Sequence, residues 1–225
     1  LTEAVESLLE QTFQDFELWI LDDGSSDQTY LIASQLAFKD KRIRVFTHQQ
    51  NRGRIVTVNA KVHAVQSPFF TVTDADDISL PDRLAKQIQC LQSDPSLMMC
   101  GTSYAAINAA GYLVREMRLL SDLNALRARS LHQSPFMGPT TIMRREVLLD
   151  FPEFYRSYCG EQMADADLAT RILDKQAATN LTEILYLYRI LPDSITRKNI
   201  TPRSLNLHRL IGYLSHQRRT KGRDY

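Results

Sequence analysis

Apolar residues in this chain follow two kinds of pattern, short continuous runs and helical spacings of three and four residues. Short runs bounded by polar turns indicate buried strands, and they cover Phe16–Leu21, Ile43–Phe46, Phe69–Thr73, Leu97–Gly101, Thr140–Met143 and Ile184–Ile190. Helical spacing covers 1–12, a segment ending near 36, and 55–65, 81–91, 121–131, 145–149, 160–173 and 201–214. Strands that alternate with helices are typical of a parallel sheet wrapped by helices, so the pattern predicts an α/β fold.

The strand that begins at Phe69 ends in three acids, Asp74, Asp76 and Asp77. A run of aromatic and β-branched residues favours burial, whereas a carboxylate is costly to bury without a partner. We therefore expect these acids at the carboxyl edge of the sheet, where open α/β sheets bind ligands. The spacing of Asp74 and Asp76 lets both carboxylates reach one divalent cation, and oxygen ligands suit Mg²⁺ or Mn²⁺. A solvated acidic turn accounts for the same three residues equally well.

A second polar edge follows the first predicted strand, where Asp22 and Asp23 precede a glycine turn. The loop after the next strand carries Arg52 and Arg54 on either side of Gly53, at the start of a predicted helix. An arginine beside backbone N–H groups at a helix N-terminus suits a phosphate. The alternative is that the acids belong to a capped turn and the arginines are solvated.

Asp165 and Asp167 lie in what the pattern predicts to be the first turn of the helix that opens at Gly160. Negative charge there is favoured by about 0.3–1 kcal/mol through the helix dipole. This position alone therefore explains the two acids without any functional role.

Composition limits the classes of function that remain. A chain of 225 residues with 44% hydrophobic content can bury one substantial core, and a net charge of +1 gives no field that recruits nucleic acid. The three cysteines are far apart and form no Cys-x-x-Cys pair, which favours a reducing compartment over a zinc site. We expect a cytoplasmic protein, with the inner face of the membrane as an alternative. That contact would use the basic C-terminal tail, which is more typical of a solvated helix end.

Five motifs occur in an order that resembles family 2 glycosyltransferases of the GT-A fold. They are Asp22–Asp27, Asn51–Gly53, Asp74–Asp77, Asp165–Leu168 with Arg171, and Tyr188–Ile190. The resemblance covers residues 1 to about 198. It implies a Rossmann-like, mostly parallel sheet flanked by helices, with a smaller mixed region on the acceptor side. The implied GT-A domain spans 1–198, with a nucleotide-sugar half at 1–100 and an acceptor half at 101–198, before a C-terminal helix and basic tail at 199–225.

The resemblance also implies a reaction. An inverting glycosyltransferase would move a sugar from a nucleoside-diphosphate sugar, here a UDP-sugar, to a hydroxyl of a carbohydrate or lipid-linked sugar, in polysaccharide or cell-surface glycan synthesis. The implied roles are general base for Asp165, binding of Mn²⁺ or Mg²⁺ for Asp76, and donor binding for Asp22, Asp23, Arg52, Asp74 and Arg189. The loop Ser194–Arg197 is implied to close near the diphosphate.

Three departures from the family pattern leave alternatives open. The family's first strand is missing, so we expect residues before Leu1 to belong to the native protein and to supply a central strand. Ala164 stands where an acid often precedes the base, and Leu191 stands where a histidine often follows. These two residues favour a non-catalytic nucleotide-sugar binding module as one alternative. A nucleotidyltransferase is another, although the Gly-rich basic loop typical of that class is not visible. The sugar, the acceptor and the oligomeric state are not predicted.

Overall fold

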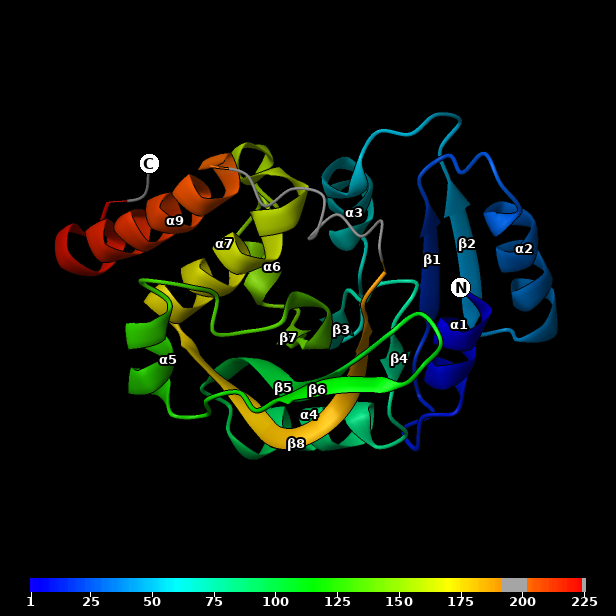
Figure 1. Cartoon of the computed structure of the whole chain (residues 1–225), viewed down its shortest axis with the longest axis horizontal. Coiled ribbons are helices and arrows are strands. Elements are labelled where there is room, and N and C mark those ends of the chain that lie inside the picture. The colour runs from blue at the N-terminus through cyan, green and yellow to red at the C-terminus, as the bar shows by residue number, and fades with distance from the viewer. Residues whose placement is uncertain (192–201, 224–225) are drawn as a thin grey trace.

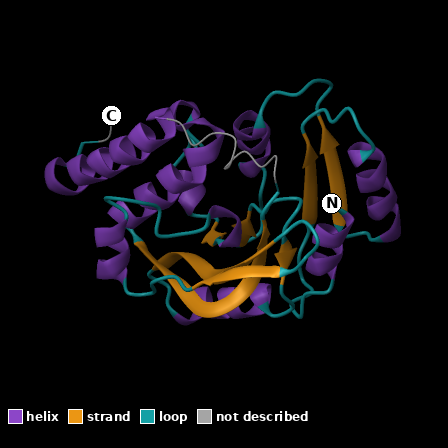
Figure 2. Ribbon diagram, viewed as in Figure 1, coloured by secondary structure: helices purple, strands orange, loops and turns teal. Residues whose placement is uncertain are grey.

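The computed structural model describes residues 1–191 and 202–223, which form an α/β fold with two sheets (Figures 1 and 2). The smaller sheet is a parallel pair, β1 (Leu18–Asp22) and β2 (Ile43–Thr47). Helices α1 (Thr2–Leu9) and α2 (Thr29–Lys39) lie beside it at the right of Figure 1. Their buried apolar faces close a core with the two strands, made of Val5, Ile20, Ala33, Leu36 and Ile43.

The larger sheet has six strands in the order β3-β7-β5-β8-β4, with β6 paired to β5. The strands are β3 (Phe69–Thr71), β4 (Ile78–Ser79), β5 (Leu97–Ile107), β6 (Leu113–Met117), β7 (Ile142–Arg144) and β8 (Ala177–Arg189). The pair β5–β8 is parallel, and the other pairs are antiparallel. The predicted α/β class is confirmed, but this sheet is mixed rather than mostly parallel. One reason is the short turn between β5 and β6, because a parallel pair requires a long crossover connection.

Helices cover both faces of the larger sheet. They are α3 (Arg54–Val62), α4 (Arg83–Ser93), α5 (Leu123–Arg129), α6 (Val147–Asp150) and α7 (Gly160–Lys175), with short 3₁₀ turns at Gly138–Thr140 and Ser157–Cys159. Met99 and Met143 pack in the core under α3, α6 and α7, whereas their neighbours Cys100 and Ile142 pack against α4. Successive residues of a strand point to opposite faces, so this alternation places α4 on the face opposite the other helices.

Two strands are longer than the apolar pattern predicts. β5 continues beyond Gly101 to Ile107, and β8 begins at Ala177 rather than near Ile184. Both extensions bury polar side chains that find partners: the Thr102 hydroxyl donates to the Glu183 carbonyl at 2.7 Å, and Asn180 donates to the Leu120 carbonyl at 2.8 Å. The spacing of apolar residues does not predict that such polar residues are buried, because their burial depends on hydrogen-bond partners elsewhere in the chain.

The start of α5 also differs from the prediction. The helix begins at Leu123, and its N-cap is Asp122 rather than Ser121. The Asp122 carboxylate accepts a hydrogen bond from the backbone N–H of Ala125 at 2.8 Å, which satisfies one of the free donors of the first turn.

The C-terminal helix α9 (Pro202–Lys221) packs against α7 through apolar contacts and an ion-pair cluster. Asp174, of which 1% of the side chain is exposed, accepts from Arg218 Nε at 2.6 Å and from Arg219 Nε at 2.5 Å. Two cations of the basic tail therefore stabilise the packing of the helix. Across the described residues, none of the helices combines the length and the apolar content that a membrane span requires. Membrane contact through the tail stays a prediction.

Among the described strands, no hydrogen-bonded ladder joins the two sheets, because β1 pairs with β2 and β3 pairs with β7. The predicted central strand from residues before Leu1 stays a prediction. The predicted loop Ser194–Arg197 lies outside the described residues.

Candidate functional site

Asp22 ends β1 and is buried against the end of β2. Its Oδ2 accepts from the Thr47 hydroxyl at 2.7 Å, and its Oδ1 accepts from the backbone N–H of Ser25 at 3.2 Å. Burial alone would raise the pKa of Asp22, but the hydrogen bonds from Ser25 and Thr47 outweigh it and leave the pKa below its ordinary value. The side chain is therefore an ionised acceptor at the carboxyl end of the strand.

Asp23 binds the loop that leads into α3. Its Oδ1 accepts from the Arg52 N–H at 2.9 Å and the Thr57 hydroxyl at 2.7 Å, and its Oδ2 accepts from the Gly53 N–H at 2.7 Å. Gly53 has a φ of +89°, a backbone conformation that glycine adopts readily. Asp23 therefore fixes the position of the α3 N-terminus. The Arg52 side chain belongs to an exposed residue of this loop, and its predicted role in donor binding stays a prediction.

The acids after β3 lie in three different environments. Asp76 is exposed, Asp77 is buried, and Asp74 is half-buried. Burial raises the pKa of Asp74 to about 6, although the nearby Arg54 acts in the opposite direction. Burial also raises the pKa of Asp77 to about 7, against a hydrogen bond from the Arg189 N–H at 2.8 Å. Asp76 therefore faces solvent, while Asp77 anchors the loop to β8.

Arg189, at the end of β8, binds the backbone of this acidic loop. Its Nε donates to the Asp76 carbonyl at 2.9 Å, its Nη1 to the Ala109 carbonyl at 3.2 Å, and its Nη2 to Glu3 at 2.6 Å. The contact with Glu3 ties the loop to α1. The structure thus gives Arg189 a supporting position, and the donor contact implied by the resemblance stays a prediction.

The buried Asp77 makes stability depend on pH. Its pKa rises from 3.8 to about 7 on folding, so the stability associated with its protonated form is present below about pH 4 and is lost as pH rises through about 7. The linkage is on the order of 4 kcal/mol. In metal-free denaturant titrations, Asp77→Asn should therefore lose less unfolding free energy between pH 5 and pH 8 than the wild type. An unchanged pH dependence, matching that of the exposed control Asp15→Asn, would contradict this prediction.

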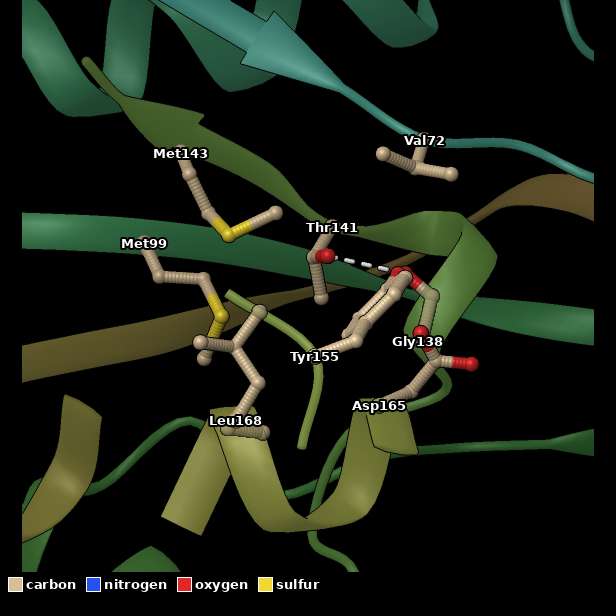
Figure 3. Close-up of a pocket in the computed structure, with 9 residues that line it drawn as sticks. Val72, Met99, Gly138, Thr141, Met143, Tyr155, Asp165 and Leu168 are labelled. Atoms are coloured by element: carbon tan, nitrogen blue, oxygen red, sulfur yellow. Dashed lines mark hydrogen bonds between the residues drawn. The ribbon is translucent and has the colours of Figure 1, made fainter. Parts of the chain in front are cut away.

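Asp165 lies in the second turn of α7, because the helix begins at Gly160. The prediction that it occupies the first turn is wrong, and the helix dipole therefore does not account for it. Arg54 Nη2 donates to both Asp165 oxygens at 3.1 Å, and the guanidinium carbon of Arg54 lies 5.1 Å from the centre of the Tyr155 ring. Tyr155 also hydrogen-bonds Asp165. Figure 3 shows Asp165 and Tyr155 beside Gly138, where an added Cβ would lie 2.5 Å from Asp165.

Asp167, two residues further along α7, has a different role. It is fully buried and accepts from Arg171 Nε at 2.8 Å. The two remaining nitrogens of Arg171 donate to the carbonyls of Glu153 at 3.2 Å and Phe154 at 2.6 Å. This pair therefore fixes the segment that presents Tyr155 to Asp165.

The N-terminus of α3 is where the separate acids meet. Asp23 accepts from the N–H groups of Arg52 and Gly53 just before the helix, Glu161 from α7 accepts from the Ile55 N–H at 3.4 Å, and Arg54 binds Asp165. Burial alone would lower the pKa of Arg54, yet the negative charges of Asp165 and Asp74 and the hydrogen bond to Asp165 raise it. The structure therefore brings Asp23, Asp74 and Asp165 around one helix end. Sequence reasoning named Arg54 only as a phosphate contact and missed Tyr155, which lies in a stretch without a motif.

The acids after β3 fit a cation that is shared with a phosphorylated ligand. Within the described part of the chain, no cluster of three or more His, Cys, Asp or Glu side chains could hold a metal alone. Mg²⁺ and Mn²⁺ are commonly held by one or two carboxylates plus substrate phosphates and water. Asp76, exposed beside the half-buried Asp74, offers such oxygen ligands.

Comparison with known proteins gives a consistent result. The model of the family described as Glycosyl transferase family 2 matches residues 1–151. The putative glycosyltransferase EpsE of Bacillus subtilis is 29% identical over 206 residues, which are 89% of this chain and 72% of the relative. The O-antigen biosynthesis glycosyltransferase WbnJ of Escherichia coli is 32% identical over 195 residues, 83% of this chain and 73% of the relative.

Two solved structures share the fold at lower identity. TarS of S. aureus in complex with UDP-GlcNAc aligns with a TM-score of 0.72 and 20% identity, over 93% of this chain and 61% of that chain. The mannosyltransferase PcManGT from Pyrobaculum calidifontis, in complex with GDP-Man and Mn²⁺, aligns with a TM-score of 0.66 and 17% identity, over 93% of this chain and 65% of that chain. The chain therefore spans less than two thirds of each of these solved chains.

Proposed function

Because this chain belongs to glycosyl transferase family 2 and has the GT-A fold, we propose that it moves a sugar from a nucleoside-diphosphate sugar to an acceptor hydroxyl, with inversion at the anomeric carbon. The observation that carries the proposal is the meeting of Asp23, Asp74 and Asp165 around the N-terminus of α3. Polysaccharide or cell-surface glycan synthesis is the proposed setting, supported by the O-antigen role in the name of the E. coli relative.

The nucleoside is proposed to bind beside β1 and β2. A hollow of about 630 Å³, including its open mouth, is lined there by Leu21, Val45, Phe46, Thr47, His48, Thr57 and Lys61. Thr47 and Thr57 hold Asp22 and Asp23 at its edge. An ionised carboxylate only accepts hydrogen bonds, so Asp22 suits the N–H of a base such as uracil. The TarS complexes with UDP and UDP-GlcNAc support a UDP-sugar as the first donor to test.

The diphosphate is proposed to lie at the acidic loop, with Asp76 and Asp74 holding Mn²⁺ or Mg²⁺ against it. The cation would supply Lewis-acid stabilisation of the departing nucleoside diphosphate. Arg189 keeps the loop in place through the Asp76 carbonyl, and Asp23 keeps the α3 N-terminus in place through Gly53. Both contacts fix the geometry of the ligands before the donor arrives.

Asp165 is proposed as the general base. As the acceptor oxygen attacks the anomeric carbon, Asp165 takes the hydroxyl proton, and the bond from that carbon to the diphosphate oxygen breaks on the opposite face. One displacement of this kind inverts the anomeric configuration. Gly138 leaves room for the carboxylate, since any larger residue would overlap it.

A second candidate, a non-catalytic module that binds nucleotide sugars, is favoured by Ala164 and Leu191. Both proposals require donor binding, and only the first requires release of nucleoside diphosphate. Incubation of a bound nucleotide sugar with Mn²⁺, followed by measurement of free nucleoside diphosphate, separates them.

Donor binding should raise the melting temperature, because a ligand of the folded state stabilises it by mass action. At about 100 times its dissociation constant, a ligand adds about 2.7 kcal/mol, which corresponds to roughly 5–10 °C for a chain of this size. We expect this shift for a UDP-sugar with Mn²⁺, and a much smaller shift for Asp76→Ala. The exposed control Asp15→Ala should behave as the wild type. A panel of nucleotide sugars without any shift would refute the proposed function.

A further inference from the structure

Two aspartates of α7 form ion pairs with arginines, and the two pairs differ in burial and in hydrogen bonding. The Asp167–Arg171 pair is buried, with side-chain exposures of 0% and 2%, and its arginine also binds two backbone carbonyls. In the Asp165–Arg54 pair, the side chains are 23% and 26% exposed. Solvent-exposed pairs contribute about 0.2–1 kcal/mol, whereas breaking a fully buried pair costs several times more, so the pair that solvent reaches separates at the lower cost. The first pair is therefore fixed, and the second is exchangeable.

The geometry of the Asp165–Arg54 contact also leaves Arg54 open to another anion. A single nitrogen, Nη2, donates to both Asp165 oxygens, which differs from the stronger fork in which two nitrogens bind two oxygens. Among the described residues, Nε and Nη1 of Arg54 make no hydrogen bond. Arg54 is the first residue of α3, where the helix end favours negative charge.

Arg54 also lies between the proposed donor side of the site, which contains Asp74, and the proposed acceptor side, which contains Asp165. The charge of Asp74 on the donor side acts on it together with that of Asp165 on the acceptor side. Its guanidinium lies over the ring of the buried Tyr155, and its Nη2 also donates to the Tyr155 hydroxyl at 3.4 Å. Incoming phosphate oxygens would compete with Asp165 for the same cation.

We propose that Arg54 is a donor-responsive positioning residue, which holds the Asp165 carboxylate while the donor site is empty and transfers to the diphosphate when a nucleotide sugar binds. This inference rests on the proposed function. The transfer exchanges one ion pair for another and moves no proton. It frees the Asp165 oxygens for the acceptor hydroxyl only once a donor is present, and so couples donor binding to activation of the base.

The test is a double-mutant cycle on UDP affinity, measured by titration calorimetry with Mg²⁺. If UDP competes with Asp165 for Arg54, then Asp165→Asn should tighten UDP binding by about twofold to fivefold, the range that corresponds to a partly exposed pair. In the Arg54→Gln background, the same substitution should leave UDP affinity unchanged. The difference between the two backgrounds isolates the exchange from other effects of either substitution.

Glu161→Gln provides the charge control, because Glu161 also lies at the α3 N-terminus but contacts Ile55 rather than Arg54. Equal tightening by Glu161→Gln, or equal tightening by Asp165→Asn in both backgrounds, would show a general charge effect and overturn the exchange. Unchanged UDP affinity of Asp165→Asn in the otherwise wild-type chain would also overturn the exchange. If Arg54→Gln folds poorly, Arg54→Met replaces it, because methionine also removes the charge and keeps a long unbranched side chain. Absence of nucleoside-diphosphate binding by the wild type would instead refute the proposed function itself.

Discussion

Asp165→Asn is expected to lower donor turnover by about 10²–10⁴-fold, the usual contribution of a positioned general base. Asparagine has nearly the same shape as aspartate but cannot take the proton of the attacking hydroxyl. The position is partly exposed on α7, so the fold should tolerate the change. Because the acceptor is unknown, the measurement is hydrolysis of a nucleotide sugar with Mn²⁺, in which water replaces the acceptor and free nucleoside diphosphate is quantified.

The same variant should bind UDP at least as tightly as the wild type, since the substitution removes a negative charge near the proposed diphosphate position. Loss of turnover with retained affinity separates a chemical role from a structural one. Asp15→Asn, an exposed aspartate far from the acidic loop in sequence, serves as the matched control and should keep full turnover. Equal turnover by Asp165→Asn and the wild type would remove Asp165 from the mechanism and leave the family assignment untouched.

Most of the order of helices and strands was predictable from the sequence, although β4 and β6 were not among the predicted strands, and the pairing of strands was not predictable. Apolar runs identify a buried strand because burial is a local property of the pattern. They do not identify its neighbours, and antiparallel β7 produces the same run as a parallel strand would. The first half of β8 escaped prediction for a related reason. Asn180 is buried there only because Leu120 and Pro135, far away in sequence, supply carbonyl acceptors.

The candidate site was predictable as a set of acids at strand ends and on one helix, but not as a set of contacts. Motif order located Asp23, Asp74 and Asp165. The sequence indicated a phosphate contact for both Arg52 and Arg54, whereas the structure places Arg54 against Asp165, a contact between residues 111 positions apart. No local pattern encodes a pairing over that distance. The position of Asp165 in the second turn of α7 likewise depends on where the helix begins, and helix boundaries are poorly defined by sequence.

Arg171→Met is expected to destabilise the fold by about 3–5 kcal/mol, because it leaves the charge of Asp167 buried without its partner. The carbonyls of Glu153 and Phe154 lose donors as well, at a further cost. For a chain of this size the loss corresponds to a fall in melting temperature of roughly 6–20 °C. Thermal and denaturant unfolding of the purified variant provide the measurement.

Arg44→Met is the matched control, since Arg44 pairs with Glu17 at the surface, where the two side chains are 59% and 48% exposed. Its loss should stay within about 1 kcal/mol. A second comparison tests the cause. If the unpaired charge dominates the cost, then Asp167→Asn combined with Arg171→Met should recover part of the loss, because asparagine leaves no buried charge. A loss below about 1 kcal/mol for Arg171→Met alone would contradict the structural role of the pair, and the fixed position of Tyr155 beside Asp165 would then need another explanation.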